Sequence, residues 1–290
     1  MEALPGFSHN FKHGEVCRLK KSLYGLKQSP RAWFGRFTFA MKKYGYQQRN
    51  DENEMNKLKT ALFAEFEMKD LGDLKYFLGI EVSRSKHGIF ICQKKYILDL
   101  LAETGMIDCK PADTPMVINQ KLFVKTKAKA ADKDRYQSLV GKLIYLAHTR
   151  PDIAYAVGVV SQFMHQLQED HMGAVLRIIR YLKGTSDHGV LLKANGHLKV
   201  QIYTDADWAG DKGNRRSTSG YFSMIGGNLV TWKSKKQKVV SLSSAEVEFR
   251  GIARGLAEAL WLRKLVTEIG FAPKESIRIM SDNEVAIQIS

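Results

Sequence analysis

The sequence predicts a mixed α/β protein in two parts: a largely helical α+β region, followed from about residue 190 by a mixed-sheet α/β domain. Two observations support this prediction. Apolar residues recur at helical spacing in most segments before residue 182, whereas after Val190 they alternate as in strands until a long helix begins. With 290 residues, 44% of them apolar, the chain is long enough for two cores.

The chain is strongly basic, and the excess charge is spread along its length. Lys and Arg number 45 against 30 Asp and Glu, for a net charge of +15, which favours a polyanionic partner, most commonly nucleic acid. Three cysteines without a CxxC pair indicate neither a disulfide framework nor a zinc site. We expect an intracellular protein, cytoplasmic or nuclear, that is not secreted and has no membrane span.

Two helices and a hairpin are expected first. Ser29 and Pro30 supply the capping chemistry of a helix start, and Gly45 ends that helix. A second helix is expected over residues 52–66. Alternating apolar residues around the turn-like SRSKHG then predict a hairpin over residues 74–92.

Helices dominate the middle of the chain. A helix over residues 94–103 is followed by a polar, Lys-rich connection over residues 109–133. Three further helices are expected over residues 135–148, 153–166 and 171–182, and they should pack on one another.

Strands dominate the last part until a long helix interrupts them. The last strand and the start of a final helix complete a mixed α/β order. The expected strands are VLLK, LKVQIYTD, GYFSM, LVTWKS and IRIMS, and the long helix covers residues 243–269.

Two acidic residues follow predicted strands. Asp205 ends a strand in which Val200, Ile202 and Thr204 share one face, and Asp282 stands between a strand and the last helix. Each has a structural alternative: an Asx turn for Asp205 and a helix N-cap for Asp282.

The start of the long helix carries two acids with different surroundings. Glu246 fits a capping box with Ser243 and has Arg250 one turn later, so we interpret it as structural. Glu248 lies at the margin of the apolar stripe that faces the sheet, where a carboxylate needs a cation. Packing of the helix on the sheet should bring Glu248 near Asp205 and Asp282.

Two carboxylate charges ~4 Å apart repel each other by about 1 kcal/mol in water and by about 4 kcal/mol at an effective dielectric of 20, so three adjacent unpaired acids are unfavourable. A divalent metal ion resolves this cost. Ligands that are all oxygen suit magnesium or manganese better than zinc.

Five stretches, YTDADWAG, RRSTSGY, VTWKSKKQ, SLSSAEVEF and SDNEVAIQI, follow one another in this part. Through them the sequence resembles the ribonuclease H domain of copia-type LTR retrotransposon Pol polyproteins. The resemblance implies a ribonuclease H-like fold for residues 190–290, with Asp205, Glu248 and Asp282 as catalytic carboxylates that bind Mg²⁺ (or Mn²⁺) for two-metal phosphodiester hydrolysis. Asp207 receives no such role and is interpreted as a turn residue or a neighbour of the ligands.

Basic and hydroxyl residues near these motifs would contact the backbone and 2′-hydroxyls of an RNA–DNA hybrid. The alternative for each is a solvated hairpin rim. The candidate nucleic-acid-binding residues are Arg215, Arg216, Ser217, Lys233, Lys235, Lys236 and Lys238.

The rest of the chain resembles the reverse transcriptase domain of the same family, through VCRLKKSLYGLKQSPRAWF, MKDLGDLKYFLGIEV and SLVGKLIYLAHTRPDIAYAV. We expect a palm remnant over residues 1–108, a helical connection over 109–189 and a C-terminally truncated ribonuclease H-like domain over 190–290. The family's Asp-Asp pair has no counterpart in GYQQRNDENEM, and the first catalytic Asp of the polymerase and a later acid of the metal site are absent from the sequence. Loss of central palm strands should leave the hairpin without its sheet and expose apolar surface.

The leading hypothesis is therefore an internally deleted Pol remnant that binds nucleic acid, has lost polymerase activity, and cleaves RNA in hybrids weakly or not at all. The alternative is a catalytically inactive binding or interaction protein from the same element. Expected partners are nucleic acid and, in addition, an intact Pol protein of that element.

Overall fold

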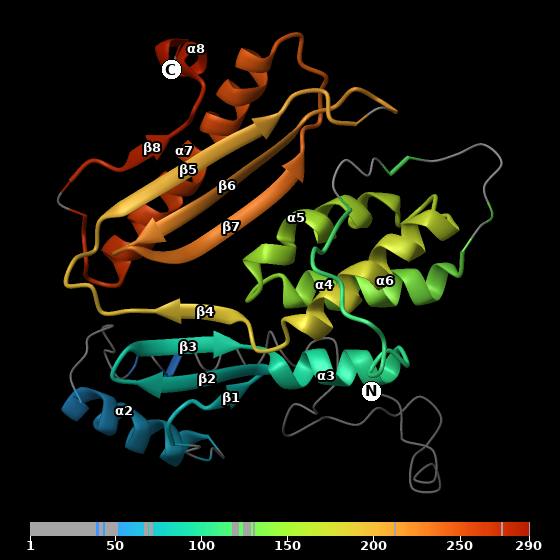
Figure 1. The fold of residues 1–290 in the computed structure, drawn as a ribbon. Coiled ribbons are helices and arrows are strands. Elements are labelled where there is room, and N and C mark those ends of the chain that lie inside the picture. Colours follow the sequence, from blue (N-terminus) through green and yellow to red (C-terminus); the bar gives the residue numbers. More distant parts are fainter. Residues whose placement is uncertain are drawn as a thin grey trace, which may run out of the picture. The chain divides into compact units, whose positions relative to one another are not determined.

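A computed structural model gives the architecture of the chain (Figure 1). The chain forms two compact units, residues 1–71 and 72–290, and each is described by itself. The structure describes residues 39–40, 43, 52–66, 69, 72–117, 122–123, 129, 131–211, 213–273 and 275–289. Apart from residues 39, 40 and 43, the helix predicted to start at Ser29 lies outside the described residues.

The described part of the first unit is mainly helix α2 (Glu52–Glu65). It confirms the helix predicted over residues 52–66. Leu62 is buried, and the Thr60 hydroxyl donates a hydrogen bond to the carbonyl of Asn56 one turn earlier.

The second unit begins with an antiparallel sheet in the order β1-β2-β3-β4. Its strands are β1 (Tyr76–Phe77), β2 (Ile80–Ser85), β3 (Gly88–Cys92) and β4 (Gly189–Leu192). Strands β2 and β3 confirm the predicted hairpin.

Two expectations about this hairpin need correction. The hairpin does not lack a sheet, because β3 pairs with β4. VLLK, which was expected among the strands of the C-terminal domain, therefore belongs to the first sheet. Gly189 explains the pairing: a Cβ there would lie 2.2 Å from the carbonyl oxygen of Ile91. Glycine thus permits the close approach of the two backbones. Exposed apolar side chains remain on β1 and the following turn, namely Tyr76, Phe77 and Leu78.

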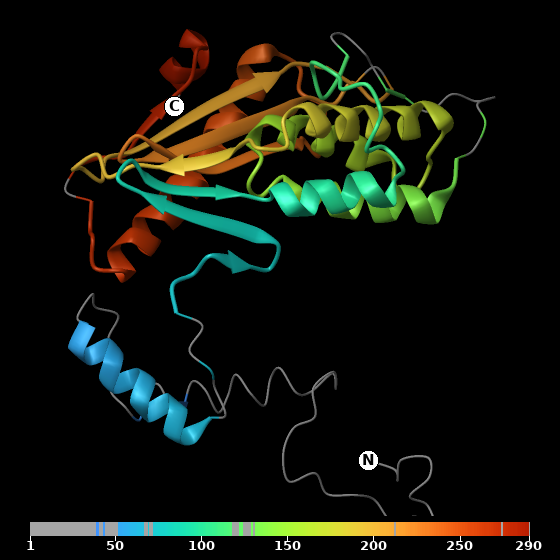
Figure 2. The same ribbon diagram turned by 60° about the horizontal axis from the view of Figure 1, so that its bottom comes forward.

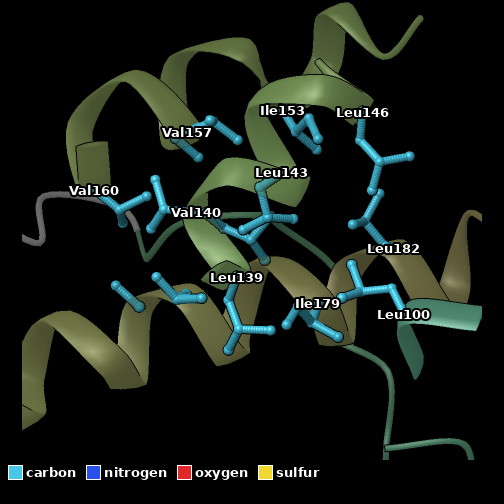
Figure 3. Packing of buried hydrophobic residues seen from close by; sticks show 14 of the residues in the cluster. Leu100, Leu139, Val140, Leu143, Leu146, Ile153, Val157, Val160, Ile179 and Leu182 are labelled. Carbon is cyan, nitrogen blue, oxygen red and sulfur yellow. The ribbon is translucent and has the colours of Figure 1, made fainter. Parts of the chain in front are cut away.

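A helical layer forms the largest core. It consists of α3 (Lys94–Glu103), α4 (Lys133–Leu146), α5 (Pro151–Val160), the 3₁₀ turn η2 (Ser161–Phe163) and α6 (Glu169–Gly184). Figure 3 shows aliphatic side chains of α4, α5 and α6 meeting Leu100 of α3. The three helices predicted from residue 135 onward therefore form and pack together. Each begins two residues before its predicted start, and the second ends at Val160 instead of residue 166.

A fully buried arginine joins the start of α5 to the end of α6. Arg150 makes two hydrogen bonds to the Asp152 carboxylate, at 2.9 and 2.6 Å, and two to the carbonyl and hydroxyl oxygens of Thr185. Tyr181 donates a further hydrogen bond to Asp152. Burial raises the pKa of Asp152, but these hydrogen bonds and the Arg150 charge outweigh it, so the net pKa is lowered.

The second sheet has the order β7-β6-β5-β8. Strands β5 (Val200–Asp207), β6 (Thr218–Ile225) and β7 (Asn228–Lys236) are antiparallel, and β8 (Arg278–Met280) is parallel to β5. Figure 2 shows β4 between β3 and the strands of this second sheet, and β4 contacts β7. The Asn228 side chain joins the two sheets through two hydrogen bonds to the backbone of Lys193, at 2.6 and 2.9 Å.

The long helix α7 (Ser244–Glu268) lies behind β5 and β6 in Figure 1, and α8 (Glu284–Ile289) follows β8. Small residues let α7 approach β5 closely: a Cβ on Gly255 would lie 2.6 Å from Cγ2 of Thr204. Ala259 and Leu262 are buried against Ile202 one and two turns later. Among the described residues, no helix is both long and apolar enough to cross a membrane.

Candidate metal centre

Strand β5 positions the first acid of the candidate site. Val200, Ile202 and Thr204 are buried as the alternation predicts, and Asp205 is exposed. Strand β5 continues two residues beyond the predicted end, to Asp207. Its cross-strand neighbour on β6 is Gly220, which has no side chain to cover the carboxylate. Asp205 is therefore accessible and stands beside open space.

Helix α7 positions the second acid in its second turn. Glu248 is only 6% exposed, and its Oε1 accepts a hydrogen bond from the Ala206 N–H at 3.1 Å. Its Oε2 is buried and has no hydrogen-bond partner within the part of the chain that the structure describes. A buried carboxylate oxygen without a donor is costly, so this atom needs a cation or a proton.

The third acid lies between β8 and α8. The parallel pairing of Tyr203 with Met280 places Asp205 and Asp282, each two residues further on, at the same edge of the sheet. The N-cap role that was the alternative for Asp282 belongs to its neighbour, because Oδ1 of Asn283 accepts from the Ala286 N–H at 2.9 Å. Asp282 is exposed and needs another explanation.

The structure brings the three predicted acids together. One carboxylate oxygen from each of Asp205, Glu248 and Asp282 lies within 4.8 Å of the others. Burial raises the pKa of Glu248; the Ala206 N–H opposes this, and the charges of Asp205 and Asp282 raise it further. Without a cation, the site therefore disfavours full ionisation.

This donor set fits a divalent metal ion. All three groups are carboxylates, the ligands that Mg²⁺ and Mn²⁺ prefer, and no soft sulfur or imidazole ligand accompanies them in the described cluster. The unpartnered Oε2 of Glu248 is the atom that a bound ion would satisfy.

Comparisons with known proteins identify the family. A family model described as reverse transcriptase (RNA-dependent DNA polymerase) matches residues 1–55 and 48–118. The retrovirus-related Pol polyprotein from transposon RE1 of Arabidopsis thaliana is 41% identical over 98% of this chain, and that from transposon TNT 1-94 of Nicotiana tabacum is 35% identical over all of it. This chain belongs to the copia-type Pol polyprotein family.

The copia-type chain spans 21% and 25% of the length of those two relatives. This chain also covers 86% of an uncharacterized mitochondrial protein of Arabidopsis thaliana. The two are 43% identical over an alignment that includes 71% of this chain. The alignments with the two Pol polyproteins are 312 and 330 residues long, more than the 290 residues of the chain. These relatives therefore have positions that the chain lacks.

Glu246, the other acid at the start of α7, has the structural role predicted for it in this Pol-family chain. The Ser243 hydroxyl accepts from the Glu246 N–H at 3.2 Å, while Glu246 accepts from the Leu242 N–H and pairs with Arg250. The Leu242 N–H and Arg250 lower the pKa of Glu246. Glu246 lies outside the acid cluster.

Asp207 also lies outside the cluster. A Cβ on Gly210 would lie 2.1 Å from Oδ2 of Asp207, so the carboxylate rests directly on this glycine. The indole N–H of Trp208 donates to the Ser241 carbonyl at 3.2 Å and holds the same turn against the segment before α7. Asp207 is the last residue of β5 and pairs with Thr218, so the expectation of a turn residue is wrong.

The candidate nucleic-acid-binding residues fall into two groups. Ser217 is fully buried and accepts from the Ala209 N–H, and Lys236 pairs with Asp211, so both support the loop between β5 and β6. Burial lowers the pKa of Lys236. The exposed residues are Arg215, Arg216, Lys233, Lys235 and Lys238.

Sequence reasoning missed Arg254 of α7. Its guanidinium donates to the Ser219 hydroxyl at 2.7 Å and to the Lys235 carbonyl at 3.1 Å, which places its charge beside β7 at Lys235. Its spacing of four residues from Arg250 was the available signal.

Proposed function

We propose that the second sheet, α7 and α8 form a ribonuclease H-like domain that binds divalent metal at Asp205, Glu248 and Asp282 and slowly cleaves the RNA strand of RNA–DNA hybrids. The observation that carries the proposal is the meeting of the three acids around a buried Glu248 oxygen without a partner. We keep the proposed division at residues 108 and 189, with β4 linking the second and third parts through its pairing with β3.

The three carboxylates have different tasks in this proposal. Glu248 is held by the Ala206 N–H and would fix the position of the ion, which is Mg²⁺ or Mn²⁺. Asp205 and Asp282 are exposed and face the side from which a phosphate can approach. A divalent ion in such a site supplies Lewis-acid stabilisation of the charge on the phosphate.

Exposed basic residues would hold the hybrid through its phosphates. Arg215 and Arg216 lie on the loop before β6, and Lys233, Lys235 and Lys238 lie on or just after β7. Binding through phosphates is independent of sequence and weakens steeply with salt. The 2′-hydroxyl distinguishes the strand to be cut.

We further propose that the chain does not polymerise DNA. The family's polymerase requires an Asp-Asp pair, and the sequence contains no two adjacent aspartates. The segment from Gly45 to Glu52 leads directly from the predicted first helix to α2. The longer alignments with Pol polyproteins support an internal loss.

A metal titration combined with a cleavage assay tests the proposal. We expect Mg²⁺ or Mn²⁺ to bind the purified chain by isothermal titration, and a hybrid labelled on its RNA strand to be cut slowly while duplex DNA stays intact. Glu248→Gln should abolish both signals, and the matched variant Glu246→Gln, two residues earlier on α7, should keep both.

The possible outcomes separate the two functional readings. Metal and hybrid binding without cleavage would favour the alternative, a catalytically inactive nucleic-acid-binding protein. Metal binding that survives Glu248→Gln, or is lost in Glu246→Gln, would show that the acids are wrongly assigned.

A further inference from the structure

A cavity of about 650 Å³ lies on the second sheet beside the acid cluster. Its floor is the face of β5, β6 and β7 that carries Tyr203, and its wall is the start of α5, including Tyr155. Thr204 packs against Gly255 of α7, so Tyr203, the next residue along β5, points to the opposite face. The volume is within the range of small-ligand sites, about 300–1,000 Å³.

The floor is a row of aromatic side chains across three strands. Tyr203 pairs with Phe222, and Phe222 pairs with Trp232, in the registers of β5, β6 and β7. The rings of Tyr203 and Phe222 are stacked, with centroids 4.7 Å apart and planes 10° from parallel. The indole N–H of Trp232 donates to the Ala147 carbonyl at 2.8 Å, which fixes that ring. Tyr155, on α5, is half-exposed and faces the same cavity.

The next cross-strand row contains the acid. Two residues along β5 from Tyr203 is Asp205, and two residues along β6 from Phe222 is Gly220. Successive rows on one face of a sheet are about 7 Å apart. Since Gly220 has no side chain, the cavity is continuous from the aromatic row to Asp205, which is one of its lining residues.

We propose that this aromatic cavity binds one unpaired base of the nucleic-acid strand whose phosphate lies at Asp205. The inference rests on the proposed function, because the metal at the acid cluster would hold that phosphate. An aromatic floor favours a planar ring, and stacking is tolerant of base identity. The acids at the rim disfavour a free anion, whereas a neutral base meets no such cost. A paired base is stacked within its duplex, so the occupant is a base that lacks a partner.

The test compares two RNA–DNA hybrids of one sequence, with and without a single unpaired 2-aminopurine nucleotide in the RNA strand. Deoxynucleotides flank that position, so the strand is not cut there. Binding to the full-length protein is measured by anisotropy in Mg²⁺ and in EDTA, and stacking is measured in Mg²⁺ by quenching of 2-aminopurine. We expect the bulged hybrid to bind roughly 5- to 100-fold more tightly and its fluorescence to be quenched.

Two substitutions locate the effect. Tyr155→Ala should reduce the preference for the bulged hybrid several-fold and lessen the quenching, whereas Tyr155→Phe should retain both. Tyr76→Ala is the matched control, because Tyr76 is also 52% exposed but lies on β1. Thermal unfolding verifies that each variant is folded.

The outcomes distinguish this inference from the proposed function. If the paired hybrid binds in a metal-dependent manner but the bulge adds nothing, or if Tyr155→Ala behaves like Tyr76→Ala, the base cavity is refuted and the metal centre stands. If neither hybrid responds to metal, the proposed function fails and this inference fails with it.

Discussion

Replacing Glu248 by glutamine should stabilise the metal-free protein and destabilise it relative to wild type when metal is present. The change keeps the shape of the side chain and removes one negative charge from the cluster. The Ala206 N–H can still donate to the new amide oxygen. The sign of the effect depends on the charges around Glu248. In the metal-free site, the charges of the described residues that act on Glu248 are those of two further acids, Asp205 and Asp282.

The magnitude follows from the geometry of the cluster. Two unit charges 4.8 Å apart repel by about 1 kcal/mol at a dielectric of 80 and by about 3.5 at an effective 20. Asp205 and Asp282 are exposed, so we take the lower value, and removing two repulsions gives about 2 kcal/mol. The hydrogen bond from the Ala206 N–H is weaker to a neutral amide than to a carboxylate, which reduces this gain in stability by about 1 kcal/mol. The net gain in the free energy of unfolding is about 1 kcal/mol, which corresponds to roughly 2–4 °C in Tm for a unit of the size of residues 72–290.

Thermal unfolding in EDTA and in Mg²⁺ measures both sides of this prediction. At 100 times its Kd, a bound ion stabilises wild type by about 2.7 kcal/mol, and the variant should lose most of this gain. The order of the two Tm values should therefore reverse between the buffers. Glu246→Gln, the control, should lose about 1 kcal/mol of capping energy in both and keep the full response to metal. A Glu248→Gln variant that is less stable in EDTA and responds normally to Mg²⁺ would refute the reasoning.

The pH dependence has a defined sign. The pKa of Glu248 in the folded state is raised above the ordinary value of 4.5, chiefly by burial. At pH values between 4.5 and the raised pKa, Glu248 holds a proton in the folded protein that it has released in the unfolded chain. The metal-free wild type should therefore gain stability relative to Glu248→Gln as the pH falls through this window, and lose it as the pH rises.

Two further substitutions test the supports of the site by urea denaturation. Gly255→Ala places a Cβ 2.6 Å from Thr204 and should lower the free energy of unfolding by about 1–3 kcal/mol. Its control is Gly141→Ala in α4, where a Cβ meets nothing within 4 Å, and this change should raise the free energy of unfolding by about 0.5–1 kcal/mol. Equal effects of the two changes would contradict close packing of α7. Asp152→Asn leaves the Arg150 charge buried without its carboxylate and should cost about 2–3 kcal/mol, less than for a fully buried pair because Asp152 is partly exposed; a neutral result would show that the Thr185 oxygens suffice.

Local patterns predicted the elements that carry the acids. The alternation before Asp205 is that of β5, and Ser243 begins α7 as its capping chemistry indicates. The positions of the two acids at the start of α7 on the helix distinguished them: Glu246 is at the capped start, and Glu248 is on the buried face. These predictions succeed because each depends on side chains within a few residues of one another.

Long-range pairing could not be derived in this way. Assigning β4 to the first sheet requires knowing that Gly189 meets the backbone of β3, more than ninety residues earlier. The aromatic row from Tyr203 to Trp232 depends on strand registers, which include an irregularity between Ser223 and Met224. Ser217 looked available as a hydroxyl, but the loop turns it inward to accept from Ala209.

Two buried charges in the second unit show why the acid cluster indicates a ligand. Arg150 is fully buried, yet Asp152 and Thr185 provide acceptors for its guanidinium, so the fold itself compensates the charge. Glu248 is almost as buried, but one of its oxygens has no donor among the described residues, and the nearest charged groups are two more acids. Since a buried charge without compensation costs several kcal/mol, a fold that retained Glu248 for structure alone would place a donor beside it, as it does for Asp152. Under the proposed function, the compensation missing at Glu248 is the positive charge that a divalent ion would supply.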